Sequence, residues 1–225
     1  MRLHRNLVFA VVDAIDQIFN EDEYADKVVE RTLKKDKRWG ARDRKFIAET
    51  TYDMVRWKRL YNEIAGTKNH YTRENIWKNF AVWAVLKGIE LPDWKQLEGV
   101  PSRRIKGKFD QLQTNRVFRE SIPDWIDTLG MEELGELHWN AEIKALNQKA
   151  NVILRTNTLK TDRIGLQNAL SKEDINTKIV PNHPDALVLE ERSNVFKTKS
   201  FHSGLFEVQD ASSQLVAAFL EVSPG

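Results

Sequence analysis

The chain has 225 residues, enough for one or two domains that each bury a core of their own. It has no cysteine, which excludes disulfides, thiolate metal ligands and a cysteine nucleophile, and its formal net charge is only +2. No apolar run approaches the roughly 20 residues that cross a bilayer, and no signal peptide is present, so we expect a soluble cytoplasmic protein without membrane contact.

The first third of the chain is predicted to be helical. Apolar residues at three- and four-residue spacing predict one helix over 3–19 and a second over 24–33. The segment 43–65 is expected to form one helix or two kinked halves. No strand is indicated in this part of the chain.

A core helix and two further helical patterns are expected next. Thr72 is the predicted N-cap of a helix that extends to Leu86, and apolar residues surround this helix on most sides. A region punctuated by proline and glycine follows. Helical patterns then recur at 109–118 and 125–134.

Strand signals begin near residue 150. The β-branched run 151–157 predicts a strand, 161–170 a helix, and 176–180 and 186–190 two more strands, which together make a β-α-β-β unit. The segment 205–225 is expected to form a strand, a capped helix and a turn. The expected fold class is therefore mainly α followed by α+β.

Charge is distributed unevenly along the chain. Residues 31–61 contain eleven Lys and Arg against four Asp and Glu, and residues 101–119 contain six against one. Residues 120–142, here called the acidic block, contain seven acids and no Lys or Arg. The basic segments indicate either a polyanionic partner or a solvated helical surface that the acidic block balances.

Aromatic residues alternate with cations in the basic segments, as in Arg38-Trp39 and around Phe46 and Trp57. Guanidinium groups bind phosphate and aromatic rings stack on unpaired bases, so this combination is typical of RNA binding. The alternative is that Phe46 and Trp57 are core residues flanked by cations that extend to solvent.

No complete active site is visible in the sequence. The five histidines form no i,i+3 or i,i+4 pair, so no metal site is expected. The ten glycines are dispersed and form no phosphate-binding, dinucleotide-binding or nucleophile-elbow motif.

Two motifs in the second half carry a resemblance to a known family. The first is NVILRTNTLK at 151–160, with Arg155 and Asn157, and the second is GLFEVQDASSQLV at 204–216, followed by SPG at 223–225. In this order they resemble the RsmB (Fmu/Sun) family of ribosomal RNA cytosine-5 methyltransferases. The matching residues of the second motif are Gly204, Gln209, Asp210, Ser212 or Ser213, and Gln214.

The first part of the chain resembles the helical domain of the transcription factor NusB, through RDRKF at 42–46 and TYDMVRW at 51–57. The resemblance implies a NusB-like helical domain over 1–122 and a small ferredoxin- or RRM-like α+β subdomain over 123–204. Residues 205–225 are then the entry segment of a Rossmann-like methyltransferase domain that is absent from this chain.

The implied function is that of the RNA-binding, auxiliary N-terminal part of a methyltransferase that uses S-adenosylmethionine. The resemblance implies ribosomal RNA as the partner, and no catalytic residue, metal or bound cofactor in this chain, which is expected to be inactive alone. The alternatives are a stand-alone NusB-like module that binds RNA or protein in transcription, and a protein-docking domain without RNA contact. The RNA-binding candidates are Arg38, Arg42, Arg44, Lys45, Arg56, Lys58, Arg59, Arg103, Arg104, Arg155, Asn157 and Lys160.

Overall fold

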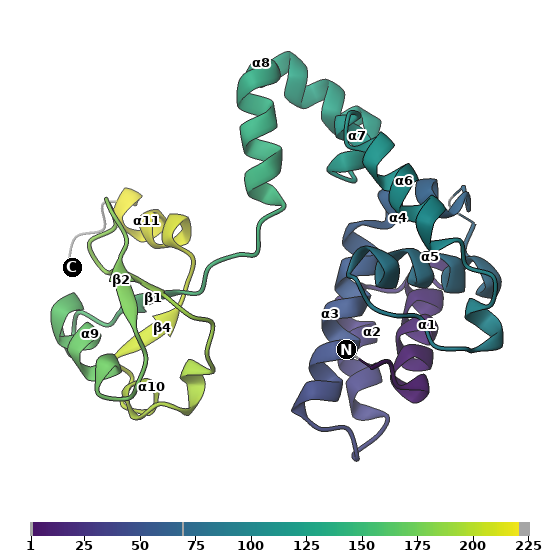
Figure 1. The fold of residues 1–225 in the computed structure, drawn as a ribbon. Helices are drawn as coiled ribbons and strands as arrows, with labels where there is room; N and C mark the ends of the chain where they lie inside the picture. The colour runs from purple at the N-terminus through teal and green to yellow at the C-terminus, as the bar shows by residue number, and fades with distance from the viewer. Residues whose placement is uncertain (1, 69, 221–225) are drawn as a thin grey trace. The chain divides into compact units, whose positions relative to one another are not determined.

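The computed structural model describes residues 2–68 and 70–220 and divides into two compact units. We call Met1–Asn147 the helical unit and Gln148–Gly225 the α+β unit. The helices of the helical unit are α1 (Arg5–Asn20), α2 (Ala25–Lys34), α3 (Ala41–Arg56), α4 (Lys58–Ala65), α5 (Arg73–Leu86), α6 (Ser102–Leu112), α7 (Arg116–Arg119) and α8 (Asp124–Leu146), with a 3-10 turn η1 at Lys95–Leu97 (Figure 1).

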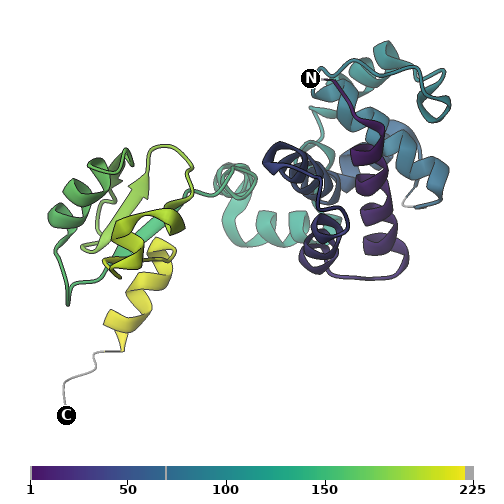
Figure 2. The same cartoon turned by 90° about the horizontal axis from the view of Figure 1, so that it is seen from below.

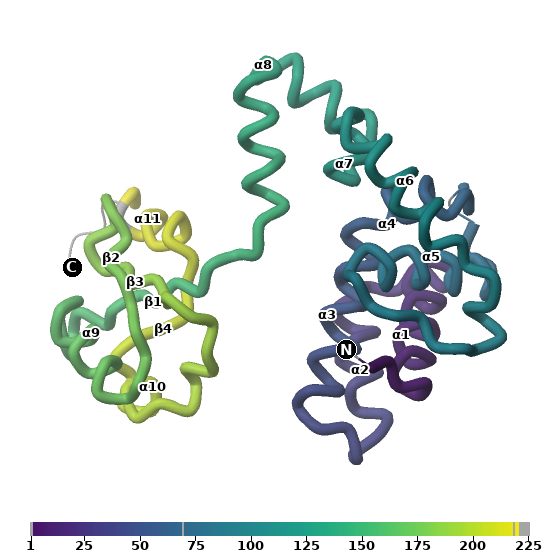
Figure 3. Tube along the Cα trace, in the orientation of Figure 1, coloured from purple at the N-terminus to yellow at the C-terminus, as the bar shows by residue number. Residues whose placement is uncertain are grey.

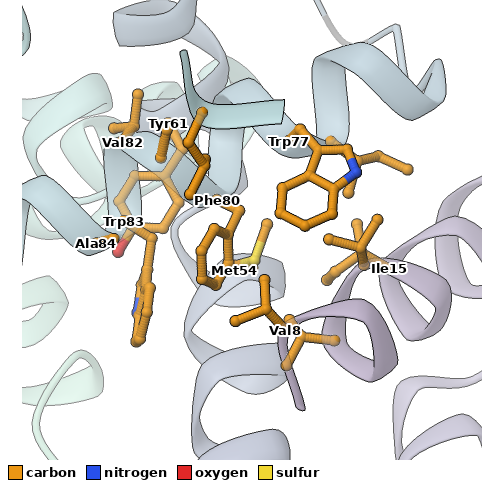
Figure 4. Packing of buried hydrophobic residues seen from close by; sticks show 14 of the residues in the cluster. Val8, Ile15, Met54, Tyr61, Trp77, Phe80, Val82, Trp83 and Ala84 are labelled. Carbon is orange, nitrogen blue, oxygen red and sulfur yellow. The ribbon is translucent and has the colours of Figure 1, made fainter. Parts of the chain in front are cut away.

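The core of the helical unit forms where α1, α3, α4 and α5 pack together. Nine of the 14 residues of α5 are buried, as expected for a helix that is apolar on most sides. Figure 4 shows Phe80 and Trp83 of α5 close to Met54 of α3, with Val8 and Ile15 of α1 on the other side. The predicted N-cap is confirmed, because the Thr72 hydroxyl accepts a hydrogen bond from an amide in the first turn of α5.

The segment 43–65 is two helices, the second of the two alternatives. Trp57 stands between α3 and α4 with φ −98° and ψ 19°, outside the range of a regular α-helix. Further along, α6 starts at Ser102, earlier than the pattern over 109–118 indicates. The helix tolerates Gly107 because that residue is exposed and has helical backbone angles.

Helix α8 is longer than the predicted 125–134 and is sharply kinked. Gly135 has φ 70° and ψ 167°, so the helix changes direction there, as the tube in Figure 3 shows. Gly130 and Trp139 are nine residues apart and would be about 13 Å apart in a straight helix. The kink brings the Trp139 ring onto Gly130, which leaves no room for a Cβ at that position.

The α+β unit has a four-stranded antiparallel sheet. Its elements are β1 (Ile153–Thr156), α9 (Arg163–Ser171), β2 (Thr177–Ile179), β3 (Ala186–Leu189), the 3-10 turn η2 (Val195–Lys197), α10 (Lys199–His202), β4 (Phe206–Val208) and α11 (Ala211–Phe219). The strand order is β2-β3-β1-β4, and in the register Leu154 faces both Leu187 and Val208. With α10 included, this is the β-α-β-β-α-β order of a ferredoxin-like fold. Figure 2 shows this unit from a second direction.

The core of the α+β unit lies between the sheet and α9. Leu154, Leu187 and Phe206 on the strands and Leu166 and Leu170 on α9 are fully buried. Buried and half-buried residues alternate along β1, as expected for a strand with one face on the core, and the strand predicted from the β-branched run 151–157 is confirmed. Helix α10 was not predicted, because four residues are too few for a helical period.

The compact units divide after α8, whereas the predicted boundary at residue 122 lies just before it; the two divisions differ in where they assign this helix. The turn predicted at 223–225 lies outside the described residues.

In the described part of the chain, no helix is both long and apolar enough to span a membrane. Nor does any group of three or more His, Asp and Glu side chains there have an arrangement that holds a metal ion.

Candidate nucleic-acid interface

Three of the predicted RNA-binding cations lie near the N-terminal end of α3. Arg42 and Lys45 are exposed and three residues apart, so they share one face of the helix. Neither side chain makes a hydrogen bond or ion pair with a residue in the described ranges. Arg38 is also exposed, but its guanidinium pairs with Asp36 (Nη2–Oδ2 2.7 Å), and the hydrogen bonds lower the pKa of Asp36 to about 2. Arg42 and Lys45 are thus available to a phosphate.

Two other predicted cations stabilise the helical unit itself. Arg44 donates to the carbonyl oxygen of Leu33, in the last turn of α2. Arg56 donates to the carbonyl oxygens of Glu120 and Ser121 (3.3 and 3.4 Å), and burial lowers the pKa of its guanidinium. Arg44 therefore joins α3 to α2, and Arg56 joins α3 to the segment before α8.

The acidic block pairs in part with the basic helices. Arg59 donates to the carbonyl oxygen of Ile122 (2.7 Å) and to the carboxylate of Asp124 (2.8 Å). Arg116 forms a two-pronged pair with Asp127 (2.7 and 3.0 Å). The alternative in which the acidic block balances basic helices of the same chain is therefore correct for Asp124 and Asp127.

The two aromatic residues of the basic segments belong to the core. Phe46 and Trp57 are half-buried and pack against the core cluster. Phe46 makes an edge-to-face contact with Trp83 (ring centroids 6.0 Å apart), and the Arg56 guanidinium lies over the Trp57 ring at 5.2 Å. Here too the alternative was correct, since these rings are core residues flanked by cations.

Two of the cavities on the helical unit are lined by predicted cations. One of about 820 Å³ lies between α5, η1 and α6, and one of about 1100 Å³ lies between α4, α6 and the start of α8. The predicted cations Arg103 and Arg104 are exposed in the first turn of α6, and Arg104 lines the smaller cavity, while Lys58 lines the larger. Lys95 and Trp125 also line these cavities but carry no sequence signal, because distant segments form the walls.

In the α+β unit, the two family motifs meet. The Asn157 amide donates to the carbonyl oxygen of Gly204 (2.8 Å), and Lys160 donates to the carbonyl of the preceding residue (2.8 Å). Gly204 has φ 66°, and a Cβ there would lie 2.8 Å from the Lys160 ammonium. Arg155 donates to the side chain of Gln209 (3.4 Å), and both line a cavity of about 470 Å³. Asn157 and Lys160 thus hold the turn before β4.

The remaining residues of the second motif organise the start of α11. The Asp210 carboxylate accepts a hydrogen bond from the amide of Ser212 (3.0 Å), and the Gln214 side chain donates to the carbonyl of Gln209 (3.1 Å). Ser212 and Ser213 are exposed. These contacts give the motif a local structural role at the end of the sheet.

The comparisons with known proteins agree with this architecture. Residues 122–196 match the family model of the RsmF/B-like methyltransferase ferredoxin-like domain, which spans α8 to η2. The probable ribosomal RNA small subunit methyltransferase B of Synechocystis sp. is 26% identical over 98% of this chain and 56% of its own length. The ribosomal RNA small subunit methyltransferase B of Pectobacterium carotovorum is 28% identical over 69% of this chain and 37% of its own length.

A solved structure agrees with the fold of the chain. The crystal structure of PH0851 superposes with a TM-score of 0.64 and 17% identity, and it covers 100% of this chain and 57% of the other. This chain thus spans little more than half the length of the Synechocystis relative and of PH0851. On these grounds the chain is a relative of the ribosomal RNA small subunit methyltransferase B proteins and corresponds to the N-terminal region of such a protein.

Proposed function

We propose that this chain is the RNA-engaging region of a ribosomal RNA cytosine-5 methyltransferase, and that it binds and orients the substrate RNA. The observation that carries this proposal is the similarity over 98% of the chain to a protein named as a ribosomal RNA methyltransferase. The exposed, unpaired cations of the chain support it, since sequence-independent RNA affinity comes mainly from Lys and Arg contacts to phosphate.

The proposed phosphate contacts are the predicted cations of the helical unit whose side chains are exposed and make no hydrogen bond, ion pair or ring contact with the described residues. Arg42 and Lys45 meet this condition on α3, as do Arg103 and Arg104 on α6. Arg44, Arg56 and Arg59 hold main-chain carbonyls, so their replacement is expected to act on folding first.

Methyl transfer is assigned to the additional sequence that the relatives possess. The C5 position of cytosine is a poor nucleophile until a thiolate adds to the neighbouring ring carbon, so this chemistry needs cysteine. The chain contains no cysteine and no glycine-rich loop, so its own residues do not fit S-adenosylmethionine or the reaction. Incubation with labelled S-adenosylmethionine and ribosomal RNA is expected to give no turnover, and turnover by this chain would refute that assignment.

The RNA proposal is tested by titrating the chain into fluorescently labelled ribosomal RNA fragments at several salt concentrations. We expect affinity to fall steeply with salt, because each phosphate contact releases counterions. The double variant Arg42→Ala, Lys45→Ala is expected to lower the salt slope by roughly two, at about one per lost contact.

A matched double variant, Lys172→Ala with Lys197→Ala, removes two exposed lysines of the α+β unit and is expected to leave the slope unchanged. If the α3 variant folds normally and keeps full affinity and slope, α3 does not contact RNA. Affinity that is independent of salt would contradict phosphate binding altogether and favour the protein-docking alternative.

A further inference from the structure

The two cavities described above adjoin each other. They share two lining residues, Gly66 and Lys108. Gly66 ends α4 in the left-handed conformation (φ 72°), and apart from its chain neighbours no atom lies within 4 Å of where its Cβ would be. Lys108 of α6 donates to the carbonyl oxygen of Glu63 on α4 beside it. We call the two adjoining cavities together the α4–α6 groove; Lys95 lines the first cavity and Trp125 the second.

The α4–α6 groove carries unpaired positive charge. Eight Lys and Arg side chains line it, against four carboxylates. Three of those carboxylates already have a cationic partner, in Glu63–Lys108, Glu74–Lys78 and Asp124–Arg59. By contrast, no ion pair or hydrogen bond joins the side chains of Lys68, Lys95 or Arg104 to the described residues. These three side chains therefore remain available to the phosphates of an incoming strand.

An exposed indole stands at one end of the groove. Trp125 is 67% exposed, whereas the other six tryptophans of the chain are buried or half-buried. It lies in the first turn of α8, whose start is fixed by hydrogen bonds from Arg59 to the carbonyl of Ile122 and to Asp124. Trp125 therefore presents an aromatic face to solvent from a rigid base, which is the requirement for stacking on a nucleobase.

The floor of the groove is also held in place. Buried Asn62 accepts hydrogen bonds from the Thr67 hydroxyl (2.9 Å) and from the Asn79 amide (2.6 Å), which ties the loop after α4 to α5. Asn62 also donates to the hydroxyl of Tyr71 (3.0 Å), whose ring stacks on Phe19. The groove thus has a fixed shape, and an incoming strand meets preformed contacts rather than ordering them.

We propose that the α4–α6 groove binds a short single-stranded segment of RNA, with one base stacked on Trp125 and phosphates along Lys68, Lys95 and Arg104. This inference rests on the proposed RNA binding of the chain and adds the site and the form of RNA. A duplex hides the faces of its bases within the helical stack and cannot reach the indole, whereas an unpaired strand can. Charge alone also suits an acidic peptide, but the exposed stacking platform favours a nucleobase.

The first test uses Trp125→Ala and Trp125→Phe in the whole chain, with binding measured by fluorescence anisotropy. The probe is a labelled ten-nucleotide RNA without secondary structure, and a blunt-ended RNA duplex serves as the comparison. We expect Trp125→Ala to weaken binding of the single strand roughly 5- to 150-fold, the range for loss of one stacked base. Trp125→Phe restores most of the affinity, and binding of the duplex is unchanged. Because the indole is exposed, Trp125→Ala is expected to leave thermal unfolding unchanged.

The second test separates charge from stacking. The double variant Lys68→Ala, Lys95→Ala is expected to lower the salt slope for the single strand by roughly 1.4, at about 0.7 per contact. Trp125→Ala lowers affinity at every salt concentration without changing the slope. The matched control is again Lys172→Ala with Lys197→Ala, which changes neither quantity.

The outcomes distinguish the groove from RNA binding as such. If the chain binds RNA and the α3 variant weakens that binding, but the groove variants do not, the groove inference is wrong and the proposed function stands. If the unaltered chain binds no RNA, both fail. If a ten-residue polyglutamate peptide binds in a manner that depends on Trp125 and the RNA does not, the groove is a protein site and the RNA inference is overturned.

Discussion

At the scale of single residues, neighbouring arginines of one helix have different tasks. Arg42 is free on the surface of α3, while Arg44, two residues further on, holds a carbonyl of α2. Side chains two positions apart on a helix point in different directions. The side chain of Arg42 therefore faces solvent, while that of Arg44 faces a neighbouring element. Composition counts both as basic residues, but only one remains available to a ligand.

Asp127 shows the same dependence on its surroundings. Its carboxylate accepts from Arg116 and from the indole of Trp139 (2.8 Å), and its side chain is only 16% exposed. The hydrogen bond with Arg116, helped by that with Trp139, lowers the pKa of Asp127 below its usual value. This member of the acidic block thus pairs with a cation of the same chain and stabilises the helical unit.

Replacement of Asp127 by Asn is expected to lower the free energy of unfolding by about 1 to 3 kcal/mol at pH 7, because Arg116 loses a charged partner. The pKa is lowered in the folded state, so the stabilisation is complete above the unfolded pKa of about 4 and is lost as the pH falls through the folded value. The difference between variant and parent should therefore shrink below about pH 4.

Urea unfolding followed by tryptophan fluorescence at pH 7 and pH 3 measures this difference. The control is Asp110→Asn, which alters an exposed carboxylate on α6. A gap between Asp127→Asn and parent that stays constant across this pH range would mean that charge plays no part.

At the scale of elements, three glycines within helices have different structural surroundings. Gly135 allows the kink of α8 with its positive φ, and Gly130 leaves room for the Trp139 ring. Gly107 lies on the exposed face of α6, where a Cβ would meet no atom within 4 Å. Glycine lowers the stability of a helix at all three positions. At Gly135 and Gly130 the kink and the Trp139 packing require it, whereas at Gly107 no contact or backbone angle does.

Gly130→Ala and Gly107→Ala are therefore expected to change stability in opposite directions. At Gly130 the new Cβ overlaps the Trp139 ring, and overpacking of this kind costs about 1 to 3 kcal/mol, more than the roughly 1 kcal/mol that helix propensity returns. At Gly107 only the propensity acts, so the helical unit gains about 0.5 to 1 kcal/mol.

Chemical denaturation of both variants, monitored by tryptophan fluorescence, measures the two changes. Because both substitutions are Gly→Ala in helices, each serves as the other's control. Equal effects of the same sign would contradict the packing of Trp139 on Gly130.

At the scale of the whole molecule, the chain has two cores that do not share residues. The largest core cluster lies in the helical unit, and the cluster around Leu154 and Phe206 lies in the α+β unit. All seven tryptophans are in the helical unit, so their fluorescence reports on that unit alone. The two units are expected to unfold as separate cooperative transitions.

Asn157→Ala tests this separation. The substitution removes the hydrogen bond to the carbonyl of Gly204 and is expected to destabilise the α+β unit by about 1 to 3 kcal/mol. Hydrogen exchange measured by mass spectrometry should become faster over 153–208, while the fluorescence transition of the helical unit stays at the same denaturant concentration. Thr158→Ala, at an exposed neighbour, is the control. A shift of the fluorescence transition in Asn157→Ala would mean that the units unfold together.

The sequence by itself determined the order of elements, the change from helices to an α+β unit, the Thr72 cap and the likeness to the methyltransferase family. These are properties of local period, capping and motif, which a chain carries without reference to its fold. It did not foresee α10, the kink at Gly135 or the length of α8, because one short helix and one left-handed glycine have no periodic signature.

Only the tertiary structure decided which cations are available and where a ligand can lie. The α4–α6 groove joins side chains from α4, α5, α6 and the start of α8, and its two cavities adjoin beside the end of α4 at Gly66. Trp125 is exposed while Phe46 and Trp57 are packed, although all three stand in polar sequence surroundings. Burial and pairing are set by contacts between distant segments, and therefore the surface that meets a partner is a property of the fold.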